Sequence, residues 1–246
     1  MTILCIETST SVCSAAICKD GMPTKQCINY EGSNHARLLP LYIEELLSFA
    51  REQNLSLDAV ALSEGPGSYT GLRIGTATAK GLCYGLNIPL IPVPTLEVLC
   101  EAAKSKIENR ESKIENRKST LIPMIDARRM EVYTAVMGDG LRDTAARAVV
   151  VENEDSLKLS NKDLSPKPSN EDAVYYFGDG AEKCQRVLTK PNWYYLPGIV
   201  PEARYVGLLA EQSSIDNRRS KINIAYYEPY YLKEFIAAPS HVKGLN

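Results

Sequence analysis

A run of hydroxyl residues near the start of the sequence could bind phosphate. Thr8, Ser9, Thr10 and Ser11 follow Glu7 between two apolar stretches. Successive backbone N–H groups in such a turn can converge on phosphate oxygens. The same residues can equally form a Ser/Thr turn whose side chains satisfy the neighbouring backbone. The sequence alone therefore leaves a phosphate site and a purely structural turn both open.

A second candidate is the glycine-rich segment EGPGSYTGLRIG, residues 64–75. Its glycines at Gly65, Gly67 and Gly71 stand between a predicted buried strand and a predicted helix. Glycine there permits positive φ angles and the close approach of a ligand or another element to the backbone. The segment is neither a Rossmann fingerprint nor a Walker A loop, because no Gly-Lys-Ser/Thr follows it.

The helix after this segment has a line of small residues, because Gly71, Gly75 and Ala79 recur at every fourth position. A helical glycine costs about 1 kcal/mol relative to alanine, so close packing must compensate. The packing partner is either this domain itself or a helix of another chain. If it is another chain, Gly75→Leu or Ala79→Arg should leave the fold intact and abolish pairing.

Metal and nucleophile chemistry find little support in the sequence. The two histidines, His35 and His241, are too far apart in the chain to form a short metal-binding motif. Seven cysteines include no C-x-x-C pair, which favours reduced thiols over zinc or disulfides. No serine or cysteine stands in a recognisable pattern with a histidine. We therefore expect neither a metal site nor nucleophilic catalysis.

Composition predicts a globular protein without a strong attraction for nucleic acid. The 246 residues are 44% hydrophobic and 24% charged, and the net charge is −2. A sequence pI of about 5.9 provides no overall positive field for phosphate backbones. The beginning of the sequence lacks a basic segment of the secretory type, and no apolar run is long enough for a membrane span. We expect a cytoplasmic location and no membrane contact.

Hydrophobic periodicity predicts an α/β protein. An antiparallel hairpin should come first, followed by helices and strands in alternation, which favours parallel pairing. Pro40 should lie in the first turn of its helix, Asn87 should cap the next helix, and Thr95 should cap the third. Strands are predicted at residues 3–6, 14–18, 59–62, 90–93, 121–125, 131–137 and 174–177. Helices are predicted at residues 36–52, 70–86, 181–188 and 201–212, and from Thr95.

A tandem duplication, SKIENRE followed by SKIENRK, interrupts this pattern and suggests a solvated helical spur or an insertion. We use it to divide the chain into four parts. Residues 1–103 form a first lobe, 104–118 a charged linker, 119–215 a smaller second α/β lobe, and 216–246 a C-terminal tail. The aromatic sequence AYYEPYYLKEF in this tail should lie against the body of the protein or a partner.

Several segments together resemble the TsaB family, also called YeaZ. They are IETSTSVCSAAI, HARLLPLYIEELL, ALSEGPGSYTGLRIGTATAKGLCYGLNIPLIPV and DARRMEVY, with weaker similarity in YYFGDGA and EPYYLKEF. The resemblance covers residues 1–137 densely apart from the duplication. It implies the ribonuclease H-like fold of the actin-like ATPase superfamily, with two α/β lobes.

The resemblance also implies a role in making N6-threonylcarbamoyladenosine at position 37 of tRNAs that read codons beginning with A. In bacteria TsaC forms threonylcarbamoyl-adenylate, and TsaD transfers the threonylcarbamoyl group with the help of TsaB and the ATPase TsaE. TsaB is the non-catalytic paralogue of TsaD. The implied partners are therefore TsaD, TsaE and a second TsaB, with tRNA bound only through the complex.

Two positions in this chain depart from the catalytic paralogue. Where TsaD has two metal-binding histidines, this sequence has Thr95 and Leu99, so the resemblance implies no metal. It also implies no cofactor of the chain's own, with ATP or ADP only at a joint site of the complex. The alternative hypothesis is an independent enzyme, either an ATPase that uses the hydroxyl turn or a peptidase.

In this family the two helices matching residues 36–52 and 70–86 form the partner-binding bundle. The candidate interface residues are Leu39, Ile43, Leu46, Leu47, Gly71, Ile74, Gly75, Thr78, Ala79 and Leu82.

Overall fold

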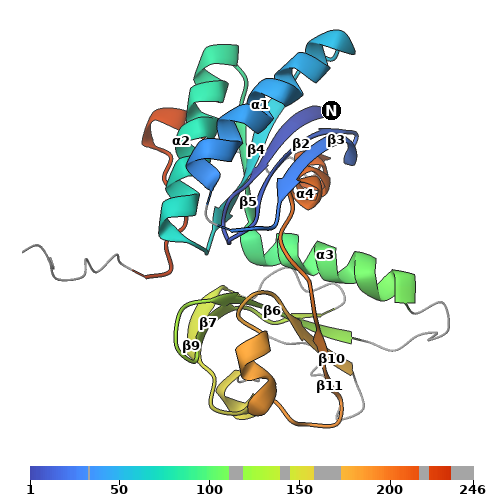
Figure 1. Cartoon of the computed structure of the whole chain (residues 1–246), viewed down its shortest axis with the longest axis vertical. Helices are drawn as coiled ribbons and strands as arrows, with labels where there is room; N and C mark the ends of the chain where they lie inside the picture. The colour runs from blue at the N-terminus through green and yellow to red at the C-terminus, as the bar shows by residue number, and fades with distance from the viewer. Residues whose placement is uncertain (33, 111–118, 139–144, 158–172, 216–221, 234–246) are drawn as a thin grey trace, which may run out of the picture.

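The computed structural model describes the chain except for residues 33, 111–118, 139–144, 158–172, 216–221 and 234–246. Two α/β lobes lie one above the other, and helix α3 (Thr95–Arg110) runs between them (Figure 1). Each lobe is built on its own mixed sheet. None of the described helices is both long and apolar enough to cross a membrane.

The first lobe contains a five-stranded sheet in the order β3-β2-β1-β4-β5. The predicted hairpin is confirmed as an antiparallel pair, and β4 and β5 continue the sheet in parallel with β1. A third antiparallel strand, β3, was missed because its sequence MPTKQCIN does not alternate apolar and polar residues, and only Cys27 in it is buried. The strands are β1 (Thr2–Glu7), β2 (Cys13–Lys19), β3 (Met22–Asn29), β4 (Ala59–Gly65) and β5 (Leu90–Pro94).

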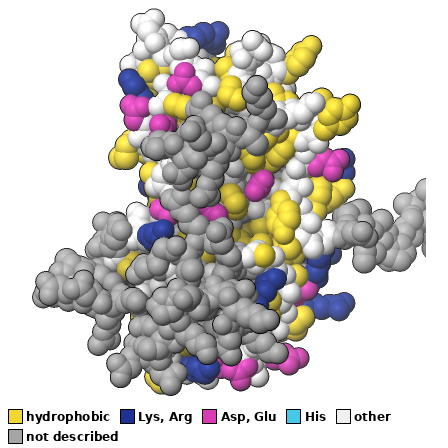
Figure 2. Space-filling view, turned by 180° about the vertical axis from the view of Figure 1, so that it is seen from behind, with side chains coloured by type: hydrophobic (Ala, Val, Ile, Leu, Met, Phe, Trp, Pro, Cys, Tyr) yellow, Lys and Arg dark blue, Asp and Glu magenta, His cyan; other side chains and the backbone are white. Residues whose placement is uncertain are grey.

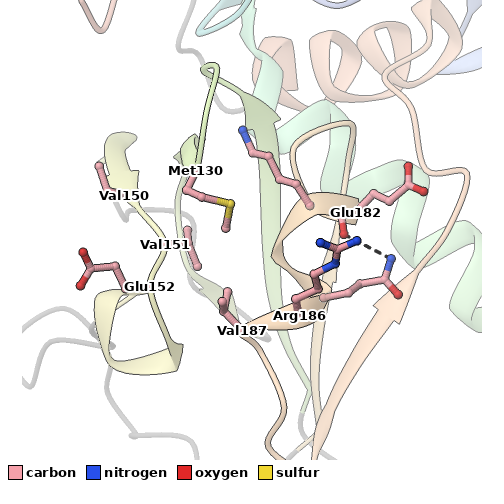
Figure 3. A pocket seen from close by; sticks show the side chains of 9 residues that line it. Met130, Val150, Val151, Glu152, Glu182, Arg186 and Val187 are labelled. Atoms are coloured by element: carbon pink, nitrogen blue, oxygen red, sulfur yellow. Dashed lines mark hydrogen bonds between the residues drawn. The ribbon is translucent and has the colours of Figure 1, made fainter.

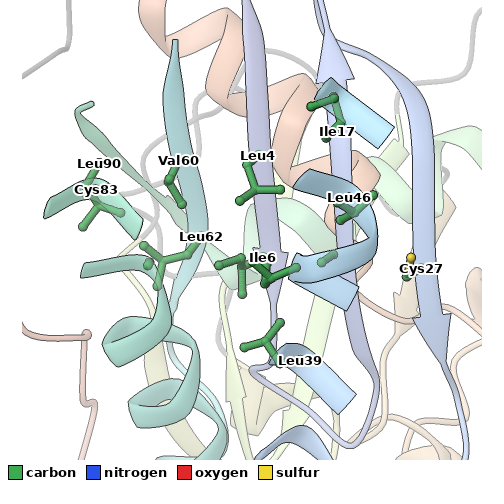
Figure 4. Packing of buried hydrophobic residues seen from close by; sticks show 14 of the residues in the cluster. Leu4, Ile6, Ile17, Cys27, Leu39, Leu46, Val60, Leu62, Cys83 and Leu90 are labelled. Atoms are coloured by element: carbon green, nitrogen blue, oxygen red, sulfur yellow. The ribbon is translucent and has the colours of Figure 1, made fainter. Parts of the chain in front are cut away.

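Helices cover both faces of this sheet. Helices α1 (His35–Glu52) and α2 (Tyr69–Leu86) lie on one face, and α4 (Ala203–Ile215) lies on the other (Figure 1). Burial of side chains such as Leu4, Ile6 and Leu46 from the strands and α1 forms the core between them (Figure 4). This apolar burial is the main stabilising contribution that positions the two helices.

Three predictions about helix ends had different outcomes. Asn87 adopts the expected left-handed conformation, with φ of 53°, and its N–H group donates to the carbonyl oxygen of Cys83. Pro40, in contrast, lies in the second turn of α1 and not in the first, because the helix begins at His35. The expected Thr95 cap is also wrong, since its buried Oγ1 has no hydrogen-bond partner.

The second lobe contains a sheet in the order β11-β10-β6-β7-β9, with β8 paired to β6. Strands predicted at residues 121–125 and 174–177 are confirmed, whereas the strand predicted at 131–137 is broken into β7 and β8. The short helix predicted at 181–188 is a 3-10 turn. The elements are β6 (Ser119–Asp126), β7 (Glu131–Thr134), β8 (Met137–Gly138), β9 (Arg147–Val150), η1 (Glu154–Leu157), β10 (Ala173–Phe177), η2 (Glu182–Arg186) and β11 (Trp193–Leu196).

Helices α3 and α4 do not follow the division drawn from the sequence. Helix α3 continues through residues 105–110 of the first SKIENR copy, and the second copy lies outside the described residues. Helix α4 follows the second sheet in sequence but packs on the first, with Ala203, Val206 and Ala210 against β1 and β2. The second lobe is therefore inserted between elements of the first.

The aromatic tail lies against the body of the protein, which was one of its two expected positions. The segment of residues 222–233, here called the C-terminal strap, contains the short turn η3 (Ile224–Tyr226) and runs beside α2. Lys80 of α2 donates hydrogen bonds to the carbonyl oxygens of Ala225 and Tyr227, at 3.0 and 3.1 Å. The space-filling view from behind shows hydrophobic side chains along the edge where α2 and η3 lie (Figure 2).

Candidate functional site

The small residues Gly71, Gly75 and Ala79, here called the inner stripe, pack within their own domain. All three are buried. A Cβ atom on Gly71 would lie 2.0 Å from the carbonyl oxygen of Thr8, and one on Gly75 would lie 2.3 Å from Thr8 Oγ1. Such distances are far inside van der Waals contact. The inner stripe therefore lets α2 approach the end of β1, which is the first of the two interpretations left open.

The same finding divides the ten predicted interface residues. Leu39, Ile43 and Leu46 are also buried, so six of the ten belong to the core of the first lobe together with the inner stripe. The helical spacing of these six residues reflects the face of α1 and α2 that packs on the sheet. The half-buried residues that remain accessible to a partner are Leu47, Ile74, Thr78 and Leu82.

A second line of small residues faces outward on α2. Ala77, Gly81 and Gly85 are exposed and recur at every fourth position; they are here called the outer ridge. Apart from the neighbouring residues and the backbone of α2 itself, no atom of the described residues lies within 4 Å of the place where a Cβ of Gly81 or Gly85 would stand. Tyr84 beside them is 88% exposed, and Leu41 on α1 is 55% exposed. An apolar surface of this kind lets another backbone approach closely.

Sequence reasoning gave too little weight to this ridge. The spacing of Gly81 and Gly85 was the available signal, since two glycines four apart in a helix need a reason. The four-residue spacing of two glycines does not show whether they face the solvent or the sheet, because it is the same in both cases. The direction follows only from which residues meet the sheet.

The hydroxyl turn is folded in on itself. Thr8, Ser9 and Thr10 are buried, and only Ser11 is exposed. Thr8 Oγ1 donates to the carbonyl oxygen of Gly71 at 2.8 Å. The N–H of Val12 donates to Thr10 Oγ1 at 3.3 Å. These contacts are those of the structural turn, which the sequence left open beside the phosphate site.

A buried carboxyl group holds this turn. Glu7 has no exposed surface, and it accepts hydrogen bonds from the Ser9 amide at 2.6 Å, from the Ser9 hydroxyl at 2.5 Å and from the Ser63 hydroxyl. Burial raises the pKa of Glu7, and these hydrogen bonds offset only part of that effect. A raised pKa and a full set of internal partners make Glu7 a structural acid of the lobe.

The glycines of the EGPGS segment are explained by two close approaches of protein backbone. Gly65 has φ of 118°, and a Cβ there would lie 2.4 Å from the carbonyl oxygen of Tyr230 in the strap. A Cβ on Gly67 would lie 2.3 Å from the carbonyl oxygen of Ser9. Tyr230 also donates its N–H to the carbonyl oxygen of Glu64 at 2.7 Å. The segment therefore receives the strap on one side and the hydroxyl turn on the other.

A pocket of about 220 Å³ opens between the lobes at this point. Burial raises the pKa of Glu64, and the negative charge of Glu97 raises it further. Two carboxyl groups in one small pocket oppose the binding of a polyphosphate. The lining comes from both lobes and the strap: Glu64, Gly65, Pro66, Pro94, Leu96, Glu97, Ala135, Met137, Ala146 and Tyr230.

A second, open hollow of about 1000 Å³ lies on the second lobe. Met130 and Val151 lie on one side of it, and Glu182 and Arg186 lie on the other (Figure 3). It is lined by Met130, Val150, Val151, Glu152, Glu182, Lys183, Gln185, Arg186 and Val187.

Groups for metal or covalent chemistry do not gather in the part of the chain that the structure describes. No cluster of three His, Cys, Asp or Glu residues suited to a metal ion occurs there. Thr95 and Leu99, at the positions compared with metal-binding histidines, are both buried. Leu99 packs in the core between α3 and the second sheet. All seven cysteines are buried free thiols.

Comparison with known proteins decides the family. A model of the family described as TsaD, tRNA N6-adenosine threonylcarbamoyltransferase, matches residues 30–237. The chain belongs to this family. Several of its relatives are TsaB proteins. The tRNA threonylcarbamoyladenosine biosynthesis protein TsaB of Haemophilus influenzae is 27% identical over 234 residues, which are 95% of this chain and 94% of that protein.

Further TsaB relatives and solved structures agree. TsaB of Escherichia coli is 34% identical over 135 residues, 55% of this chain and 54% of that protein. YeaZ from Pseudomonas aeruginosa has a TM-score of 0.69 at 25% identity, covering 94% of this chain and 99% of that one. Another Pseudomonas aeruginosa structure, described as similar to peptidase YEAZ, has a TM-score of 0.71 at 23% identity. The TsaB (YeaZ) resemblance and its two-lobed fold are thereby confirmed.

Proposed function

We propose that this TsaB family member is a non-catalytic subunit that pairs with TsaD in the formation of N6-threonylcarbamoyladenosine in tRNA. The observation that carries the proposal is the outer ridge of Ala77, Gly81 and Gly85, with exposed Tyr84 beside it. Exposed glycines lower the intrinsic stability of a helix. On this side of α2, no packing within the described part of the same domain compensates for that cost. A helix of another subunit, packed on the outer ridge, would supply these contacts.

The half-buried residues along the same helix extend this face. Ile74, Thr78 and Leu82 lie between the inner stripe and the outer ridge, at the same four-residue spacing. Leu41 adds an exposed apolar side chain from α1. The proposed docking face therefore consists of the outward sides of α1 and α2. It keeps Ile74, Thr78 and Leu82 from the residues expected from the sequence and adds the outer ridge.

The chemistry of the described residues supports an accessory role over an independent enzyme. An ATPase would use the hydroxyl turn to bind phosphate, but here the side chains of Thr8 and Ser9 form hydrogen bonds within the domain. The acidic pocket between the lobes disfavours a nucleotide held by this chain alone. We therefore assign ATP or ADP to a joint site of the complex, and tRNA binding to the complex as well.

The remaining partners follow from the same assignment. A second copy of this chain can use the outer ridge when TsaD is absent, giving a homodimer, because both associations need a close-packed helix face. TsaE would join the assembled pair. We place this activity in the cytoplasm, where tRNA is modified.

The test compares the wild-type chain with Gly81→Arg in a mixture with TsaD on a sizing column. The arginine projects into open space, so the thermal midpoint should stay within a few degrees while the complex is lost. Met22→Arg is the matched control, because Met22 is 67% exposed on β3, away from α2. Complex formation by Gly81→Arg at wild-type strength would refute the docking face.

The accessory role has its own test. Threonylcarbamoyl transfer and ATP turnover are assayed for the chain alone and for the chain mixed with TsaD. We expect transfer only in the mixture. Robust turnover by the purified chain alone would instead support the independent ATPase or peptidase.

A further inference from the structure

The loop between β6 and β7 has an unusual backbone. Arg128 and Arg129 are consecutive and both have positive φ, of 73° and 50°. This left-handed conformation costs a non-glycine residue roughly 1 kcal/mol, and hairpin loops that need it normally use glycine or asparagine. Two adjacent arginines there oppose the local preference, and such strain persists only where the surroundings impose it.

Hydrogen bonds at both ends of the loop hold Arg128 and Arg129 in this left-handed conformation. Asp126 Oδ1 accepts from the N–H of Arg128 at 3.1 Å, and the N–H of Glu131 donates to the carbonyl oxygen of Arg128 at 3.0 Å. Asp179 Oδ1 accepts from the N–H of Asp126 at 2.9 Å. Lys183 donates to the carbonyl oxygen of Glu131 at 2.7 Å. The loop is therefore rigid.

The carboxylates of this network already have cationic partners. Lys183 forms an ion pair with Asp126, and Lys233 of the strap forms one with Glu131. Burial raises the pKa of Asp179, whose carboxylate accepts the N–H of Asp126. Both arginines are exposed, and no ion pair or side-chain hydrogen bond joins either guanidinium to another residue within the described ranges. Arg128 and Arg129 therefore present two positive charges to the solvent.

The open hollow on the second lobe adjoins the loop. Met130, the residue after Arg129, lines the hollow of about 1000 Å³ on the second lobe. Its lining combines apolar side chains with two cationic ones, Lys183 and Arg186, and two acidic ones, Glu152 and Glu182. Arg186 and the apolar Met130, Val151 and Val187 are drawn in Figure 3. A nucleotide chain that contacts the loop with its phosphates could lay a sugar or base over such a surface.

We propose that Arg128 and Arg129 bind backbone phosphates of the tRNA in the assembled complex. This inference rests on the proposed function, since it assigns this chain a direct part in tRNA binding. Guanidinium groups held on a rigid loop suit phosphate oxygens, which accept paired hydrogen bonds. The contact fixes the position of the tRNA without reading its sequence.

The experiment measures tRNA affinity at several salt concentrations for the wild type and for Arg128→Ala/Arg129→Ala. It is run on the complex with TsaD and, separately, on the chain alone. Losing two phosphate contacts should weaken binding about tenfold near 0.1 M salt and reduce the slope of log affinity against log salt by about 1.5. Assembly with TsaD on a sizing column should be unchanged, which separates this inference from the pairing itself.

Two further variants make the result specific. Lys19→Ala/Arg51→Ala removes the same charge from exposed positions on the first lobe and should leave the salt slope unchanged. Arg128→Gly/Arg129→Gly removes the strained side chains, so it should raise the thermal midpoint while it weakens tRNA binding as alanine does. Unchanged affinity and slope in both arms, or equal losses in the control, would overturn the proposal.

Discussion

The two sides of helix α2 carry the same kind of residue for opposite reasons. On the inner stripe, Gly71 and Gly75 are glycine because Thr8 occupies the space that a side chain would need. On the outer ridge, a Cβ on Gly81 or Gly85 would face open space outside the helix. Both pairs have a four-residue spacing. A periodic small-residue pattern therefore identifies a close approach without identifying its partner.

The largest effect should come from enlarging the inner side. Gly75→Leu puts a branched side chain where Thr8 Oγ1 already lies 2.3 Å from the Cβ position. We expect it to destabilise the fold by more than about 3 kcal/mol, against the earlier expectation of an intact fold. A fall in the thermal midpoint of about 6 °C or more, measured by circular dichroism, would agree. A wild-type midpoint would show that β1 and α2 can separate at no cost.

A smaller and better-matched contrast uses alanine at one position on each side. Gly71→Ala brings its Cβ against the Thr8 carbonyl and should cost about 2 kcal/mol. Gly81→Ala meets nothing and should stabilise the helix by about 0.5–1 kcal/mol. Urea unfolding of the two variants measures both signs in the same protein. Equal effects would remove the distinction between the two sides.

The smallest effect concerns the buried acid beneath the start of α2. Because burial raises the pKa of Glu7 above its ordinary value of 4.5, the folded state retains this proton longer than the unfolded state. The contribution of Glu7 to stability should therefore fall as the pH rises through the folded pKa. Glu7→Gln should lose that part of the pH dependence, measured by urea unfolding from pH 4 upward. Parallel curves for both proteins would contradict the assignment.

The elements of the first lobe were predictable because their patterns are local. The apolar run at β1, the helical spacing in α1 and the capping residue Asn87 each act within a few neighbours. The strand β3 was not predictable, because its sequence has no regular apolar alternation and it forms a strand by pairing with β2. The continuation of α3 into the first copy of the charged repeat agrees with the helical spur, which was one of the two interpretations of that repeat.

The candidate site was predictable only as a pair of helices. Leu39 and Leu46 have the spacing of a buried face, but the same spacing would suit an interface. The choice depends on the sheet that lies beneath them, which the helix sequence does not encode. The strained loop at Arg128 and Arg129 was beyond sequence reasoning, because arginine is a residue that normally avoids that conformation.

The insertion of one lobe within the other has a consequence for synthesis. The first sheet begins at Thr2, yet one of its faces is covered by α4, which begins at Ala203. During translation, α4 can cover that face only after most of the chain has left the ribosome. The second sheet, in contrast, has all its strands once Leu196 has been synthesised. The segment made in the middle can therefore fold before the segment made first. A nascent chain that stalls before Ala203 would leave the underside of the first sheet bare to chaperones.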